Sequence, residues 1–249
     1  MKMGYIIPLT PLVVEFTRKR GRYEFPHETS HMIRVKDIRR HMEEKKATTS
    51  KIAATIGYSF LDNLNTLRNV VSTNTQGKEE LTISTVNQFD DRIDQFWNKV
   101  KNSYDFVVER KKPWLNWRYA DPRAGQYIIK IAEKDGEIKG YIVLELRQQN
   151  DYVEGYITDL LTTPKEPTII EALVQESLKF FDELEINAVH SRVVKGNPQQ
   201  TALRKCGFID APLAKPLIIF INWFDDQGEK DHLNVSSPEK IHFSYGDYF

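Results

Sequence analysis

The chain has 249 residues, of which 40% are hydrophobic, and its 35 Lys and Arg residues balance 35 Asp and Glu residues. This length allows one large domain or two small ones with a sizeable core. The zero net charge argues against a nucleic-acid binder, which is normally basic. No apolar run approaches the ~20 residues that span a bilayer, and the single cysteine, Cys206, excludes internal disulfides and cysteine-based zinc sites. These exclusions leave a globular protein that we expect in the cytoplasm, with no membrane partner and no metal.

The first 80 residues have a different pattern from the rest of the chain. Apolar residues recur with a 3.6-residue period between positions 52 and 71, which predicts an amphipathic helix. A polar stretch containing glycine follows at 72–80 and is typical of a linker. The other elements predicted in this part are a helix at 8–20, two short strands within 23–35 and a charged helix at 36–46.

From residue 81 onward, strands and helices are clearly marked. Strong boundary signals are Asp135-Gly136, a hairpin turn, and Asn197 and Gly207, which begin and end a helix. The predicted elements are a strand at 81–86, a helix at 90–103, a short helix starting at Pro113, three strands within 125–161, a helix at 168–184, a strand at 186–194, a helix at 197–207 and a strand at 216–224. We expect the closing residues, 240–249, to pack at an edge. The order predicts an α/β (mixed α+β) fold with a mixed sheet flanked by helices and a helical N-terminal extension.

Four stretches in this order carry a resemblance to a known family. They are WLNWRYADPRAGQY at 114–127, EGYITDLL at 154–161, NPQQTALRKCGF at 197–208 and FSYGDYF at 243–249. Together they resemble the GNAT superfamily of N-acetyltransferases over residues 81–249, which we interpret as a GNAT-like domain. Residues 1–80 form either a plain helical extension or the tail of a degenerate tandem GNAT copy, which FTRKRGRYEF at 16–25 resembles. Such a remnant would leave apolar surface exposed, which predicts a homodimer.

The resemblance implies acetyl-CoA, or another acyl-CoA, as cofactor, with its pyrophosphate at a helix N-terminus. The equivalent loop here, 162–170, has no glycine; it has two prolines that remove N–H donors, and Glu166 adds a negative charge. A capped helix that binds nothing is the alternative interpretation. The residues that the resemblance assigns to the cofactor are Leu160, Leu161, Thr162, Lys165, Thr168, Ile169, Ile170 and Asn197. Of these, Thr168, Ile169 and Ile170 would offer free backbone amides.

Two strand carboxylates are candidates for the catalytic base, Asp159 and Glu145. Alternation places Asp159 on one face with Ile157 and Leu161, and an apolar face would raise its pKa toward neutrality. The alternative is a solvated or ion-paired acid. The family's proton-donating tyrosine is missing, because Leu203 stands at that position.

The resemblance also places Trp117, Arg118 and Tyr119 beside the acceptor, where aromatic rings stack and a guanidinium binds an anion. Alternatively the tryptophans are core residues and Arg118 pairs with Asp121.

The leading hypothesis is therefore an acyl-CoA-dependent N-acyltransferase that acetylates an amine of a small molecule or peptide. The missing glycines and tyrosine favour a catalytically inactive GNAT-fold binding or assembly module as the alternative. A third, an adaptor for charged partners that uses the basic residues of the N-terminal part, conflicts with the zero net charge.

Overall fold

The computed structural model describes residues 3–6, 15, 17, 19, 23–24, 27–45, 81–149, 151–211, 220–223 and 237–248. The helix predicted at 52–71 and the linker at 72–80 lie outside these residues. Among the helices that are described, none is long and apolar enough to cross a membrane.

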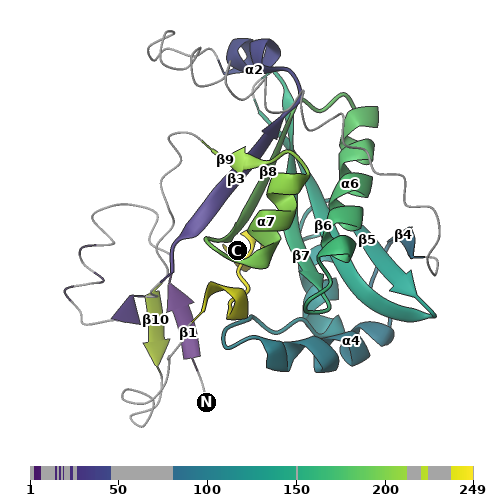
Figure 1. Ribbon diagram of the computed structural model, residues 1–249, viewed down its shortest axis with the longest axis vertical. Coiled ribbons are helices and arrows are strands. Elements are labelled where there is room, and N and C mark those ends of the chain that lie inside the picture. The colour runs from purple at the N-terminus through teal and green to yellow at the C-terminus, as the bar shows by residue number, and fades with distance from the viewer. Residues whose placement is uncertain are drawn as a thin grey trace.

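A seven-stranded mixed sheet forms the centre of the described structure (Figure 1). All neighbouring strands run antiparallel except β7 and β8, which are parallel. In their order across the sheet, the strands are β4 (Thr82–Val86), β5 (Tyr127–Lys134), β6 (Glu137–Gln148), β7 (Val153–Thr162), β8 (Ala188–Val194), β3 (Thr29–Val35) and β9 (Ile209–Asp210). The predicted mixed α+β fold is confirmed.

Turns and caps explain where several of these elements begin and end. Asp135 and Gly136 both have positive φ, 55° and 75°, as the predicted tight hairpin between β5 and β6 requires. The Asn197 side chain accepts a hydrogen bond from the backbone N–H of Gln199 at 2.8 Å and so caps the next helix, while Gly207 follows its end with a φ of 90°. These sequence predictions are confirmed.

Successive side chains of each strand point to opposite faces of the sheet and pack into two separate hydrophobic cores. On β6, Tyr141 and Val143 face one core and Ile142 and Leu144 face the other. The helices α6 (Pro167–Glu183) and α7 (Pro198–Lys205) cover the Ile142 face, whereas α4 (Arg92–Val100), η1 (Lys101–Ser103), α5 (Lys112–Leu115) and the π-helical turn η2 (Asn116–Ala120) lie on the Tyr141 side. The middle of β6, from Gly140 to Leu144, is therefore buried on both faces.

The strand β3 comes from the N-terminal part of the chain and lies inside the sheet built by the later residues. It pairs along its whole length with β8, and Ile33 also pairs with Ile209 of β9. The short helix α2 (Ile38–Glu44) follows it. A second, three-stranded sheet joins β1 (Met3–Ile6), β10 (Phe220–Trp223) and β2 (Tyr23–Glu24), so the two ends of the chain are paired there as well.

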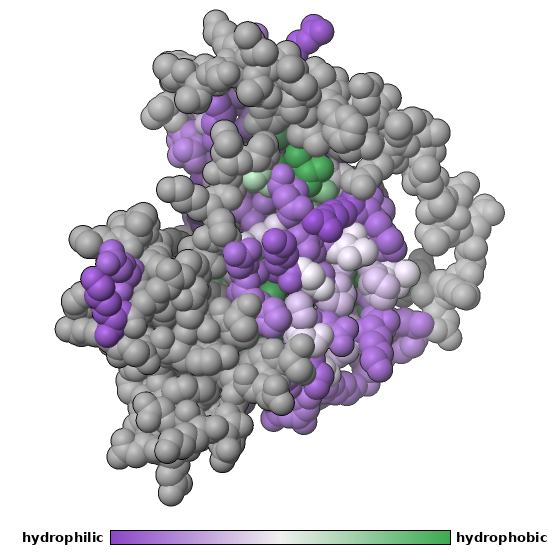
Figure 2. Space-filling model, turned by 60° about the vertical axis from the view of Figure 1, so that its left-hand side comes forward, coloured by the Kyte–Doolittle hydropathy of each residue, from purple (hydrophilic) through white to green (hydrophobic). Residues whose placement is uncertain are grey.

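The C-terminal segment comprises η3 (Pro238–Lys240), residues 241–244 and η4 (Tyr245–Tyr248), and its residues 241–247 are buried rather than placed at an edge. Ile241, His242 and Phe243 are each at most 1% exposed. The expectation of edge packing is wrong because ionic and hydrogen-bonding groups draw this segment against β7. On the face that Figure 2 shows, the described surface is mostly hydrophilic. The exposed large hydrophobic side chains of the described residues are Trp117, Leu146 and Leu184.

Candidate functional site

The two parallel strands at the centre of the sheet separate partway along their length. β7 and β8 pair only from Gly155 to Ile157, opposite Val189 to Ser191, and among the described strands the remainder of β7 pairs with β6 alone. A β-bulge at Thr158 accompanies the separation, since Ile157 and Asp159 face consecutive residues of β6. The gap that opens beside the carboxyl end of β7 is the usual place for a ligand in a sheet of this kind.

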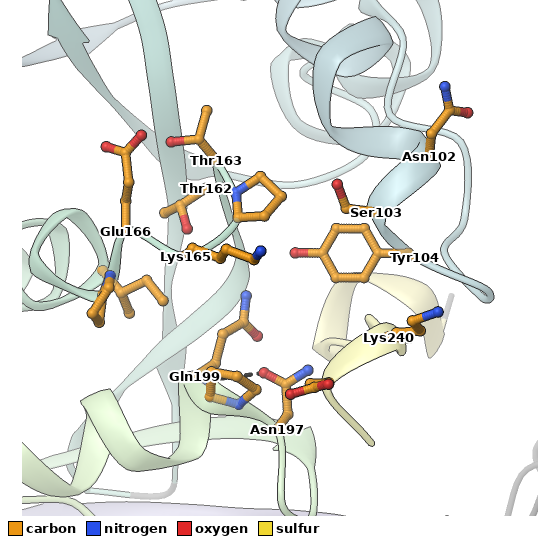
Figure 3. A pocket seen from close by; sticks show the side chains of 15 residues that line it. Asn102, Ser103, Tyr104, Thr162, Thr163, Lys165, Glu166, Asn197, Gln199 and Lys240 are labelled. Carbon is orange, nitrogen blue, oxygen red and sulfur yellow. Dashed lines mark hydrogen bonds between the residues drawn. The ribbon is translucent and has the colours of Figure 1, made fainter. Parts of the chain in front are cut away.

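A cavity of about 440 Å³ lies at this end of β7. Its volume is within the range of small-ligand sites. It opens between the N-termini of α6 and α7, the turn η1 and the C-terminal segment, as Figure 3 shows. The side chains that line it are those of Asn102, Ser103, Tyr104, Thr162, Thr163, Pro164, Lys165, Glu166, Pro167, Ile170, Asn197, Pro198, Gln199, Glu239 and Lys240.

The polar groups of the cavity suit an anionic, hydrogen-bonding ligand. Lys165 is an exposed cation at its margin, and Figure 3 shows its ammonium directed toward Tyr104. Lys240 is also exposed, but its ammonium lies 3.8 Å from Asp105 Oδ1. Glu166 is directed away from that space, so its charge opposes an anion less than the sequence suggested. The N-terminus of α6 adds the positive end of a 17-residue helix.

Lys165 has a left-handed backbone conformation, with a φ of 64°. This conformation is unusual for a residue other than glycine and concentrates at turns and functional sites. Glycine is the residue usually found at such a bend, and here Lys165 takes its place in the loop 162–170.

Half of the residues predicted to bind the cofactor line this cavity, namely Thr162, Lys165, Ile170 and Asn197. Leu160, Leu161 and Ile169 are buried in the cores, and Thr168 is exposed. The expectation of a free amide at Ile169 is wrong, because its N–H donates to the Glu166 carbonyl at 3.1 Å. Leu160 still borders the site through its carbonyl, which accepts from Gln199 Nε2 at 2.8 Å.

Asp159 lies next to this cavity in a fully buried ionic network. Its Oδ2 accepts from Arg110 Nε at 2.9 Å and from the hydroxyls of Tyr141 and Tyr119 at 2.9 and 3.2 Å. Its Oδ1 accepts from the Ser244 hydroxyl at 3.0 Å and from the Leu160 N–H at 3.0 Å, and it lies 3.3 Å from His242 Nε2. Arg110 Nη2 also donates to Asp247 Oδ1 at 2.7 Å.

The expected raised pKa of Asp159 is wrong. Burial alone would raise it, but the Arg110 charge and the hydrogen bonds from His242 and Tyr141 outweigh burial and hold the pKa of Asp159 well below its usual range. The bulge at Thr158 also overturns the expected shared face, because Ile157 lies in the α6 core and Leu161 in the α4 core. That Asp159 is the base stays a prediction.

Glu145, the second candidate base, lies on the same face of β6 as Arg147. It accepts from Arg147 Nε and Nη2 at 2.9 and 2.8 Å and from the Thr158 hydroxyl at 3.3 Å. Its side chain is 20% exposed, so water and a ligand can reach it. Glu145 does not line the cavity.

The three predicted acceptor residues separate in the structure. Trp117 is 59% exposed, contrary to a core role, while Trp114 packs partly buried against the α4 core. Arg118 is buried and donates to the Tyr127 hydroxyl at 2.8 Å; the expected pairing with Asp121 is wrong because Arg123 binds that carboxylate. Tyr119 belongs to the Asp159 network.

Several residues of the site were missed at the sequence level. Arg110 lies in a run of charges that reads as solvated surface, and nothing nearby signals its burial. Tyr104 follows a predicted helix as an ordinary loop residue. Gln199 could have been found, because it directly follows the Asn197-Pro198 helix start. Among the described residues, no group of three or more His, Cys, Asp or Glu side chains could hold a metal ion.

Comparison with solved structures supplies the fold class. No protein-family model matches the sequence, and no curated protein matches it. The chain is similar to a probable N-acyltransferase from Enterococcus faecalis, with 11% identity, a TM-score of 0.51 and coverage of 88% of this chain and 44% of that one. It is also similar to an aminoglycoside acetyltransferase from an uncultured soil metagenomic sample, with 15% identity, a TM-score of 0.40 and coverage of 54% and 90%.

A third similar structure is a tandem GNAT protein from the clavulanic acid biosynthesis pathway, with 11% identity, a TM-score of 0.48 and coverage of 88% and 63%. The chain thus spans less than half the length of the Enterococcus faecalis protein and under two thirds of the tandem one. The sheet order, the separating parallel strands and the first of these likenesses together define the class: the chain has the GNAT fold, that of the acyl-CoA N-acyltransferases.

Proposed function

We propose that this protein is an acyl-CoA-dependent N-acyltransferase that uses the cavity at the end of β7 for its cofactor. The observation that carries the proposal is the position of this cavity, where β7 and β8 separate and the N-termini of α6 and α7 lie close to Lys165. Acetyl-CoA, when bound, supplies an acyl group on a thioester. The acceptor is an amine of a small molecule or peptide, and we propose a cytoplasmic homodimer as the acting form.

The residues present fit the phosphates and amides of such a cofactor. Lys165 and the first turn of α6 offer positive charge to the phosphates. Thr162, Thr163 and Gln199 offer hydroxyl and amide groups along the inner wall. Glu145 is the accessible carboxylate for taking up a proton from the amine, since its side chain is partly exposed and lies beside the bulge.

The test is calorimetric titration of the purified protein with acetyl-CoA. Lys165→Ala should weaken binding about 5- to 10-fold, because an exposed charge-assisted contact is lost. Lys179→Ala is the matched control: Lys179 is an exposed lysine of α6 whose ammonium is 3.6 Å from Glu176 and which does not line the cavity. It should leave the affinity unchanged. Equal affinities of the two variants for acetyl-CoA would contradict the assignment of Lys165 to the cofactor phosphates.

The inactive binding module remains the second candidate, favoured by two observations. Leu203 is fully buried and has no proton to give, and Pro164 and Pro167 leave the loop with fewer donors. If the wild-type protein binds neither acetyl-CoA nor CoA, this alternative replaces the acyltransferase. Binding followed by release of free thiol in the presence of an amine panel would support the enzyme.

A further inference from the structure

Glu145 of β6 lies between two tyrosines on the face of the sheet opposite α6 and α7. In the strand register it stands opposite Tyr127 of β5 on one side and Tyr156 of β7 on the other. Directly opposed side chains on one face of a sheet lie close enough to interact. The Thr158 hydroxyl donates to Glu145 at 3.3 Å. The carboxylate therefore has aromatic neighbours on both sides and lies beside the bulge where β7 and β8 begin to separate.

Arg147 places a guanidinium directly beside this carboxylate. Its Nε and Nη2 donate to Glu145 at 2.9 and 2.8 Å, and among the described residues its Nη1 has no hydrogen-bond partner. The guanidinium lies over the Tyr156 ring, 4.2 Å from its centre. The side chain is 32% exposed. The pair thus offers a negative and a positive group side by side, and a ligand can reach both.

A cofactor held at the N-terminus of α6 can bring its thioester to this pair. Thr162 lines the cavity, and Thr158 precedes it in β7 by four residues, which is at most about 13 Å of strand. The pantetheine arm of CoA is long enough to cover this length when it is extended. An amine bound at Glu145 would therefore lie within reach of the acyl group.

Arg147 is better placed to bind an anionic ligand than the other arginines around this face. Arg118, which the sequence assigned to the acceptor, is buried and hydrogen-bonded within the protein. Arg110 is fully buried. Arg192 of β8 is half-buried, and its guanidinium carbon lies 5.5 Å from the centre of the Tyr245 ring, so it adds positive charge on the β8 side. Arg147 combines accessibility with donors that the protein leaves available.

Resting on the proposed acyl transfer, we propose that the acceptor is an amino acid whose ammonium binds Glu145 and whose carboxylate binds Arg147. An amino acid carries these two groups on one carbon, and Glu145 and Arg147 present the opposite charges next to each other. The edge of the guanidinium formed by Nη1 and Nη2 can donate two parallel hydrogen bonds to a carboxylate. Tyr127 and Tyr156 offer aromatic surface to the amino acid side chain.

The test compares amino acids with their carboxamides, which keep the amine and the side chain but lack the negative charge. Release of free thiol from acetyl-CoA is measured with the common amino acids and the matching amides, for wild type and Arg147→Gln. Removing Arg147 also alters the surroundings of Glu145, but this effect falls on acid and amide alike. The ratio of kcat/KM for acid over amide therefore isolates the contact with the carboxylate.

Wild type should acetylate at least one amino acid, and Arg147→Gln should lower the acid-to-amide ratio about 10- to 100-fold, because a hydrogen bond to a charged group is lost. Most of the loss should lie in KM, since the carboxylate is bound equally in the ground state and the transition state. The matched control is Arg92→Gln. Arg92 is similarly exposed, pairs with Asp90 and Glu133, and lies at the other end of β6, beside Gly136. It should leave the ratio unchanged.

A binding measurement on wild type keeps the proposal falsifiable even if Arg147→Gln folds poorly. Calorimetric titration of the CoA-loaded protein should show an amino acid binding at least about 10-fold more tightly than its amide. CoA-loaded protein that binds and acetylates no amino acid, that treats acid and amide alike, or that accepts only polyamines or amino sugars would overturn the proposal and leave the cofactor site standing. If the protein binds neither acetyl-CoA nor CoA, the proposed function fails, and the amino acid site fails with it.

Discussion

Replacing Asp159 by Asn tests whether the buried carboxylate anchors the fold or serves as the base. The substitution keeps the shape but removes the charge opposite Arg110, which is itself 0% exposed and retains only Asp247 as an anionic partner in the network. Breaking a fully buried ion pair by neutralising one member costs about 3–5 kcal/mol. For a chain of this length that corresponds to a decrease in Tm of about 6–20 °C.

The assay is urea unfolding followed by circular dichroism at neutral pH, repeated under acidic conditions. Because the folded pKa of Asp159 lies below the unfolded value of about 3.9, its charge stabilises the native state above that pH, and the stabilisation is lost as the pH falls further. The difference between wild type and Asp159→Asn should therefore shrink below about pH 4. Glu137→Gln is the control: Glu137 is an exposed carboxylate paired with Lys99 and Lys139, and its loss should leave the unfolding close to wild type.

One result would refute the anchoring role. If Asp159→Asn retains wild-type stability but loses acyl transfer, Asp159 is the base and the network is incidental. The other result is a large loss of stability, with unchanged binding of acetyl-CoA by the protein that remains folded. It would show that Asp159 has a structural role and no role in the site.

Two other substitutions probe the contacts that seat the C-terminal segment and the N-terminal part. Gly246→Ala should destabilise by about 1–3 kcal/mol in urea unfolding, because an added Cβ would clash with the Tyr119 hydroxyl; wild-type stability would mean that the segment is not packed there. Glu154 has a pKa lowered to about 2 by His190 and Lys45 despite its burial, so its stabilisation is present above about pH 4.3 and lost toward pH 2. As the pH falls over that range, the free energy of unfolding of Glu154→Gln should therefore decrease by about 1–2 kcal/mol less than that of wild type. Acid unfolding curves that run parallel for the two proteins would contradict this.

The sequence predicted the local elements well because their signals are local. The helix start at Asn197, its end at Gly207 and the hairpin at Asp135-Gly136 depend on cap and turn chemistry within a few residues, and each lies where it was expected. The strands and helices between 81 and 211 follow for the same reason.

The long-range pairings could not be predicted in this way. β3 pairs with β8, which is more than 150 residues away in the chain. The alternation of apolar and polar residues in a strand does not identify the strand it pairs with. The bulge at Thr158 likewise changed the face of Ile157 without leaving a mark in the sequence pattern. Arg110 was missed because its burial depends on two carboxylates that lie 49 and 137 residues away.

The Asp159 network explains how this chain keeps a defined cavity without a glycine loop. A buried ion pair adds little stability relative to apolar residues of the same size, and its best-supported benefit is to fix one arrangement. Arg110 can satisfy Asp159 and Asp247 together only when the C-terminal segment lies against β7. That placement brings the Ile241 carbonyl to Asn197 Nδ2 at 2.7 Å and the Lys240 carbonyl to the residues after Tyr104. The cap of α7 and the inner wall of the cavity therefore depend on the same buried charges, which is why we expect them to fail together.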